Sequence, residues 1–104
     1  MIIETIAMAK RKLKTTRYDS AEYLHSEKDI AAYLDAALED GDPAVIRHAL
    51  NVIARARGMT QIARDSGIAR ESLYRALAEN GNPEFTTVLK VVHALGMRLR
   101  TRAV

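Results

Sequence analysis

The sequence of 104 residues contains no cysteine, no tryptophan, one phenylalanine and only two prolines. Without cysteine the chain cannot form disulfides or thiolate metal sites, a composition compatible with a reducing cytosol. Because the aromatic residues are only Phe85 and four tyrosines, the core must consist mainly of Ala, Leu, Ile and Val, which favours close-packed helices. A chain of this length is expected to form one small domain with little room for a deep pocket.

Long hydrophobic runs are also missing. No apolar run approaches the ~18–20 residues that are needed to span a bilayer. The first residues, MIIETIAMAKRKLK, place a short apolar patch before a basic cluster, the reverse of a secretory signal. We therefore expect a soluble, cytoplasmic protein that does not bind membranes.

Groupings of residues typical of catalysis are absent from the sequence. His25, His48 and His93 are scattered, and none belongs to an HExxH or a comparable metal-binding spacing. There is no glycine loop that would cradle a phosphate and no nucleophile elbow. We expect no enzymatic activity, no catalytic residue, no metal site and no cofactor.

Charge is unevenly distributed along the chain. Residues 1–18 carry a net charge of +4, residues 19–46 a net charge of −7, and residues 47–104 a net charge of +6. The acidic segment would repel nucleic acid and attract a basic protein, whereas the basic segment can approach phosphates. Charge alone is equally compatible with ordinary solvated helix faces.

Capping residues and glycines divide the chain into helices. Outside residues 59–78, the predicted helices run from Asp19 or Ser20 through Leu24, from Ser26 to Gly41, from Asp42-Pro43 to Gly58, and from Pro83 to Gly96. The apolar stripes predicted for the last three comprise Ile30, Tyr33, Leu34, Ala37 and Leu38; Val45, Ile46, Ala49, Leu50, Ile53 and Ala54; and Phe85, Val88, Leu89, Val92 and Leu95.

Residues 59–78 have the pattern of a helix-turn-helix. A helix from Met59 to Ser66 is followed by Gly67 in the turn and by a second helix from about Arg70 to Ala78. This motif requires a small residue where the helices cross, glycine in the turn, and apolar residues that hold the second helix against the body. These requirements are met by Ala63, Gly67, Ile62, Ile68, Leu73 and Ala76 or Leu77.

The second helix of this motif has the composition of a recognition helix. With Leu73 pointing inward, its charged residues point outward, where arginine can contact guanine and glutamate can accept from cytosine. The candidate DNA-binding residues are Thr60, Gln61, Ala69, Arg70, Glu71, Ser72, Tyr74 and Arg75, with Asn80, Asn82, Thr86 and Thr87 as further phosphate donors. The alternative is a helical pair whose outward residues are merely solvated.

After Gly96 the period of the pattern changes from 3.6 to 2. Met97, Leu99 and Thr101 alternate with three arginines, which predicts a short C-terminal β-strand. No other segment resembles a strand, so it is expected to pair with a second copy in a dimer or with a partner protein. The alternative is a frayed basic tail.

The run GMTQIARDSGIARESLYRALAENGNPEFTTVLKVVHALGMRLR resembles the Xre/HigA-like antidote proteins (antitoxins) of bacterial addiction modules, a branch of the lambda-repressor-like helix-turn-helix class. The upstream stretch YDSAEYLHSEKDIAAYLDAALEDGDPAVIRHALNVIARARG is similar to their N-terminal half. The resemblance implies an all-α, five-helix domain over residues 13–104, commonly dimeric, with the helix-turn-helix at about 59–78. Residues 1–12 then form a variable N-terminal extension.

The resemblance also implies a function. Such proteins neutralise a small basic RelE/HigB-like toxin and bind double-stranded operator DNA, which represses the operon; as a dimer, this chain would read half-sites ~34 Å apart. From the −7 segment we hypothesise that Glu39, Asp40 and Asp42 contribute an acidic docking face for the toxin. Two alternatives are a toxin inhibitor with vestigial DNA binding and a free-standing phage-type repressor without a toxin.

Overall fold

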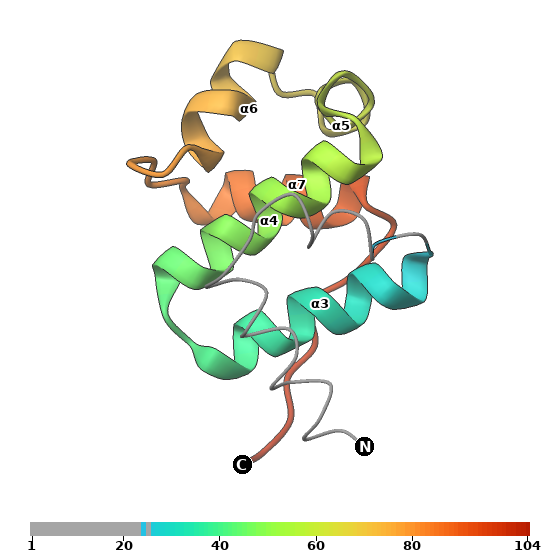
Figure 1. The fold of residues 1–104 in the computed structure, drawn as a ribbon, viewed down its shortest axis with the longest axis vertical. Coiled ribbons are helices and arrows are strands. Elements are labelled where there is room, and N and C mark those ends of the chain that lie inside the picture. The colour runs from blue at the N-terminus through green and yellow to red at the C-terminus, as the bar shows by residue number, and fades with distance from the viewer. Residues whose placement is uncertain (1–23, 25) are drawn as a thin grey trace.

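The computed structural model describes Leu24 and residues 26–104, and these residues form five helices and no strand (Figure 1). The helices are α3 (Glu27–Asp40), α4 (Pro43–Arg57), α5 (Met59–Ser66), α6 (Arg70–Leu77) and α7 (Phe85–Ala94). The expected extension over residues 1–12 and the expected helix from Asp19 or Ser20 lie outside the described residues.

Local capping explains where α3 and α4 begin and end. The hydroxyl of Ser26 accepts a hydrogen bond from the backbone N–H of Asp29 at 3.1 Å, and Gly41 ends α3 with a φ of 79°. Asp42 Oδ1 accepts from the N–H of Ala44 at 2.9 Å, and Pro43 occupies the first turn of α4, where its missing N–H costs no helical hydrogen bond. Both predicted helix starts are confirmed.

Helix α4 is the centre of the packing. It contacts α3 on one side and α5 and α6 on the other, while α5 also contacts α7 (Figure 1). The largest side chains that are fully buried between these helices are Ile30, Leu50, Val52, Ile53, Ile62, Leu73, Leu77, Val91, Val92 and Leu95. The predicted core of aliphatic residues is therefore confirmed, and it fixes α6 against the body of the protein.

Two predictions about apolar stripes are wrong at their ends. Helix α7 begins at Phe85 rather than at Pro83, and Phe85 is 69% exposed although it lies on the same side of the helix as the buried Val92. Its position in the first turn places it beyond the end of the core. Leu38, in the last turn of α3, is similarly 39% exposed.

The predicted C-terminal strand is not present. Residues 97–104 have no regular secondary structure, because nothing in the described part of the chain offers them a second strand to pair with. Burial nevertheless alternates along this segment: Met97 and Leu99 are half-buried against the core, while Arg98 and Arg100 are exposed. Thr101, the third residue assigned to a dimer strand, is exposed.

Candidate functional site

Helices α5 and α6 are joined by a tight turn that the sequence encodes locally. Gly67 has a φ of 74°, a left-handed conformation that favours glycine, and its N–H donates to the carbonyl of Ala63 at 3.0 Å. The hydroxyl of Ser66 donates to the same carbonyl at 3.3 Å and accepts from the N–H of Ile68 at 3.2 Å. These bonds fix the path of the chain into α6.

One side of α6 is anchored in the core. Leu73 and Leu77 are fully buried, and Ile62 of α5 is buried beside them in the same core cluster. Because Leu73 and Leu77 lie four positions apart on an eight-residue helix, the opposite side of α6 must face away from the body. The inward orientation of Leu73 that the sequence predicted is confirmed.

The C-terminal end of α6 is held by polar side chains from α4, which sequence reasoning missed. Arg47 Nη1 donates to the carbonyl of Ala78 at 2.7 Å, and Asn51 Nδ2 donates to the carbonyl of Leu77 at 3.0 Å. Both carbonyls belong to the helix end that lacks intrahelical partners. Their spacing of four residues places Arg47 and Asn51 on one side of α4, where both are half-buried, but this spacing does not indicate which distant carbonyls they meet.

Gly81 allows the chain to turn back closely under the end of α6. Its N–H donates to the carbonyl of Ala78 at 2.7 Å, and a Cβ atom at this position would lie 2.3 Å from the carbonyl oxygen of Ala76. Only glycine fits this approach without a shift of the backbone. The loop that follows α6 is thereby tied to it.

The outward side of α6 is polar and exposed. Arg70, Glu71, Tyr74 and Arg75 are all exposed, and Ala69 is exposed at the N-terminal end of the helix. Tyr74 is 43% exposed, unusually open for an aromatic side chain. The structure thus brings together on one surface the residues that were predicted to contact bases.

Two pairs of side chains organise this surface. The guanidinium of Arg70 lies 5.4 Å from the ring centre of Tyr74, and its Nη2 donates to the Tyr74 hydroxyl at 3.4 Å. Arg75 Nη2 lies 3.5 Å from the hydroxyl of Ser72, the limit of a hydrogen bond. Glu71 forms no ion pair with any described residue, although Arg70 and Arg75 are on the same helix. Its carboxylate therefore remains available as an acceptor.

The predicted backbone contacts lie at the edges of this surface. Thr60 and Gln61 are exposed in the first turn of α5, and Gln61 Nε2 donates to Asp65 Oδ1 at 2.9 Å. Of the additional donors predicted around α6, Asn80, Asn82 and Thr86 are exposed and Thr87 is half-buried. The N–H groups at the start of α5 receive no side-chain cap, which leaves them able to bind an anion.

The three acidic residues predicted to dock a toxin cluster where α3 meets α4. Glu39, Asp40 and Asp42 are all exposed there. The α3 and α6 helices lie on opposite sides of α4 (Figure 1). The acidic corner and the outward side of α6 are therefore separate surfaces. Asp42 has a structural role as well, because it caps α4.

The described residues contain no group of three or more His, Asp or Glu side chains arranged to hold a metal ion. Among the helices of that same part of the chain, none is long and apolar enough to cross a bilayer.

Fold and surface together define a small helical protein that presents one short, firmly anchored polar helix. The family described as probable addiction module antidote protein matches residues 14–103, and the chain belongs to this family. It is also similar to an uncharacterized protein of Haemophilus influenzae, with 49% identity over 85 residues that cover 82% of this chain and 88% of the relative. No solved structure matches the chain.

Proposed function

We propose that this chain is the antitoxin of a type II addiction module, that it binds operator DNA through α6, and that it neutralises a small basic RelE/HigB-like toxin. Family membership supports the antitoxin role and implies a toxin partner. The observation that carries the DNA-binding part is the outward side of α6, where charged and aromatic residues are exposed while Leu73 and Leu77 hold the helix in place.

The chemistry of α6 suits the edges of base pairs in the major groove. We propose that the exposed Arg75 binds guanine O6 and N7 in a bidentate manner, and that the carboxylate of Glu71, which has no ion pair among the described residues, accepts from the N4 amino group of cytosine. Arg70 and Tyr74, which contact each other, form a pre-arranged pair that can meet a phosphate or a thymine methyl group. Thr60 and Gln61 would then fix the protein on the DNA backbone.

The toxin-binding part rests on the acidic corner. Helix α3 has Glu39 and Asp40 in its last turn and no basic residue there. Carboxylates at a helix C-terminus interact unfavourably with the helix dipole, so their position there does not itself favour α3. A basic partner would bring positive charge to this exposed acidic corner. We propose that a homodimer of this chain represses the operon that encodes both proteins, and that it has no catalytic activity.

Substitution of Arg75 by alanine tests the DNA-binding role. Binding to the DNA upstream of the gene should weaken by about 1–3 kcal/mol, and preference at one base pair should be lost. Lys90→Ala is the matched control, because Lys90 is an exposed cation on α7 with no interaction among the described residues. Its loss should leave base preference unchanged.

Growth rescue against the toxin encoded beside this gene separates the proposed function from the alternatives. Arg75→Ala should still neutralise the toxin. If the unmodified chain and this variant both bind operator and unrelated DNA alike while toxin binding persists, the chain is an inhibitor in which DNA binding is vestigial. If no small basic protein is encoded next to it, the chain is a free-standing repressor.

A further inference from the structure

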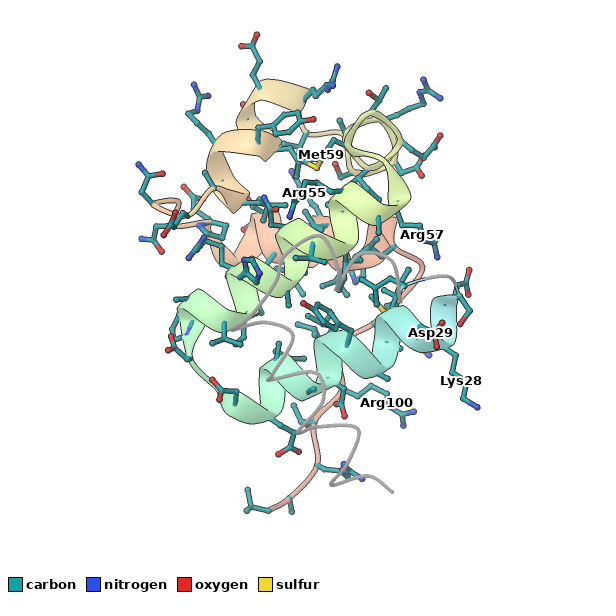
Figure 2. The ribbon with its side chains drawn as sticks, in the orientation of Figure 1. Lys28, Asp29, Arg55, Arg57, Met59 and Arg100 are labelled. Atoms are coloured by element: carbon teal, nitrogen blue, oxygen red, sulfur yellow. The ribbon has the colours of Figure 1, made fainter. Side chains whose placement is uncertain are left out.

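The outward side of α3 forms an exposed surface that the C-terminal segment borders on one side. We define the outer α3 face by six exposed residues at helical spacing: Lys28, Ala31, Ala32, Asp35, Leu38 and Glu39. None of their side chains forms a hydrogen bond or ion pair with the described residues. Figure 2 shows Lys28 pointing away from the body at the beginning of α3.

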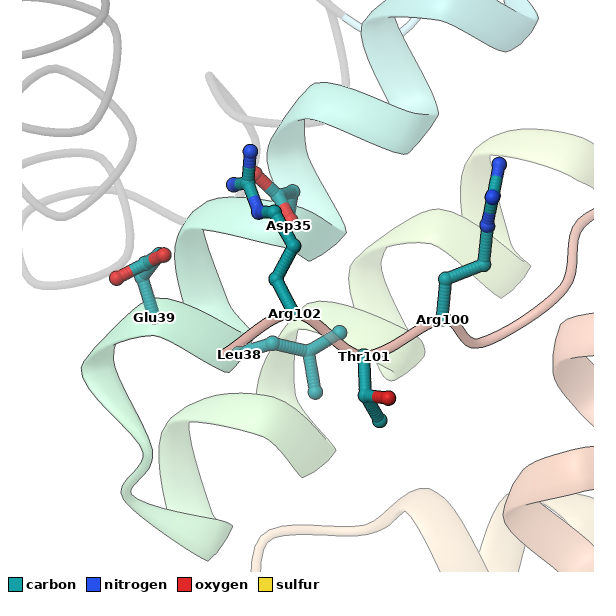
Figure 3. Close-up of a pocket in the computed structure, with 6 residues that line it drawn as sticks. All are labelled: Asp35, Leu38, Glu39, Arg100, Thr101 and Arg102. Atoms are coloured by element: carbon teal, nitrogen blue, oxygen red, sulfur yellow. The ribbon is translucent and has the colours of Figure 1, made fainter. Parts of the chain in front are cut away.

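The C-terminal segment forms a second wall beside this face. One cavity of about 500 Å³ lies between α3 and Met97–Arg100, and another of about 630 Å³ lies between Asp35, Leu38 and Glu39 on α3 and Arg100–Arg102 on the segment. In Figure 3 the guanidinium of Arg102 points toward Asp35, while Arg100 points away from both acids. The face is thus bordered by charges of both signs.

Charges on the outer α3 face are arranged in a self-complementary order. Lys28 stands at one end and Glu39 at the other, with Ala32 and Asp35 at equal distances from the midpoint between them. If a second α3 lies antiparallel against the first, each Lys28 meets the Glu39 of the other copy, and each Ala32 meets an Asp35. Alanines at positions 31 and 32 allow the two helix axes to approach closely.

We propose that two copies of this chain pair through their outer α3 faces, antiparallel, about a two-fold axis between Ala32 and Asp35. In such an isologous interface every contact occurs twice, so one Lys28–Glu39 complementarity gives two ion pairs. Leu38, 39% exposed in one copy, is covered by Ala31 of the other. Arg102, which points toward Asp35, offsets the repulsion between the two central aspartates.

The signs of the charges favour a second copy over the other possible occupants. A basic toxin on this face would meet Lys28, Arg100 and Arg102, and DNA would meet Asp35 and Glu39. Only a partner that carries positive and negative charges in the opposite order along its surface can pair with all of these groups. A second copy of the chain, lying antiparallel, is such a partner. The inference rests on the homodimer of the proposed function and identifies its contact surface, independently of α6. In this dimer Glu39 pairs with Lys28 of the other copy, and the exposed Asp40 and Asp42 are the acids of the corner that remain for a toxin.

Reciprocal charge reversal tests this pairing in the full-length chain by sedimentation equilibrium. Lys28→Glu and Glu39→Lys should each weaken the dimer at least about tenfold, because each places like charges opposite one another twice. An equimolar mixture of the two variants should form a heterodimer. In it the two introduced charges face each other across the interface. The unchanged Lys28 of one copy also faces the unchanged Glu39 of the other. Lys90→Glu on α7 is the control and should dimerise as the unmodified chain does.

Lys28→Glu places an acid near the start of α3 and Glu39→Lys a base near its end, which suits the helix dipole, so neither is expected to unfold the helix. Circular dichroism of each variant verifies this. A chain that stays monomeric, single variants with unchanged dimerisation, or a mixture that does not recover would each overturn the pairing. Binding of one copy to a single half-site through Arg75 would stand in all of these cases.

Discussion

The guanidinium of Arg47 in α4 donates a hydrogen bond to the carbonyl oxygen of Ala78, 2.7 Å away, immediately after the end of α6. Together with Asn51, it joins the central helix of the fold to the helix that we propose reads DNA. The position of α6 thus depends on polar contacts at its end as well as on Leu73 and Leu77 in the core.

Replacement of Arg47 by methionine removes this donor but keeps most of the aliphatic side chain. Because a half-buried carbonyl loses a charged partner, the free energy of unfolding should fall by about 1.5–3 kcal/mol. Urea denaturation measures this change. Arg55→Met, on the same helix but exposed and without an interaction among the described residues, should change stability little. Equal effects of the two substitutions would show that the bond to Ala78 contributes nothing specific.

Gly81→Ala should destabilise the protein by about 1–3 kcal/mol for a steric reason. The added Cβ would lie within 2.3 Å of the Ala76 carbonyl oxygen and 2.6 Å of the Arg75 carbonyl oxygen, which are rigid backbone atoms. The end of α6 or the loop after it must shift, so that amide exchange at Arg75–Ala78 should accelerate. The neighbouring exposed Asn82, changed to alanine, serves as the control. Unchanged exchange in Gly81→Ala would contradict the close approach.

The parts of the fold that were predictable from sequence are governed by neighbours along the chain. Ser26, Asp42 and Gly67 act on backbone groups two to four residues away, and the sequence shows these residues directly. The inward side of α6 follows in the same way from the spacing of Leu73 and Leu77. The exposed surface of α6 was therefore predictable as a set of residues.

The parts that could not be predicted depend on distant contacts. Arg47 and Asn51 meet carbonyls 31 and 26 residues further along the chain, a distance over which spacing rules give no guidance. The exposure of Phe85 depends on where the core ends, and the periodic pattern of α7 does not contain that information. The prediction of a C-terminal strand was wrong because alternation of apolar and charged residues specifies only the two faces of an extended segment. A strand also needs a hydrogen-bonded neighbour.

Glu71→Gln separates base recognition from general attraction to DNA. The carboxylate has no ion-pair partner among the described residues, so near a duplex it is repelled by the phosphates unless it accepts from a base. Neutralisation should tighten binding to unrelated DNA by about threefold to tenfold and reduce the preference for operator DNA. Fluorescence anisotropy at several salt concentrations measures both quantities.

The control for Glu71→Gln is Asp29→Asn, because Asp29 is an exposed acid in the first turn of α3, on the other side of α4 (Figure 2). It removes the same charge far from α6 and should leave affinity for both DNAs nearly unchanged. Unchanged binding of Glu71→Gln to unrelated DNA would place this residue away from the duplex.

Asp42 combines a helix cap with a charge in the acidic corner, and two substitutions separate these roles. Asp42→Asn keeps a side-chain oxygen that can accept from the N–H of Ala44, so stability should be preserved while one negative charge is lost. Asp42→Ala loses both the charge and the cap and should lower the free energy of unfolding by about 1 kcal/mol. If the corner docks a basic toxin, calorimetry should show weaker toxin binding by both variants, with a salt dependence smaller than that of the unmodified chain. Toxin affinity that falls only in Asp42→Ala would assign the effect to the start of α4, and the acidic docking hypothesis would then lose its support at this residue.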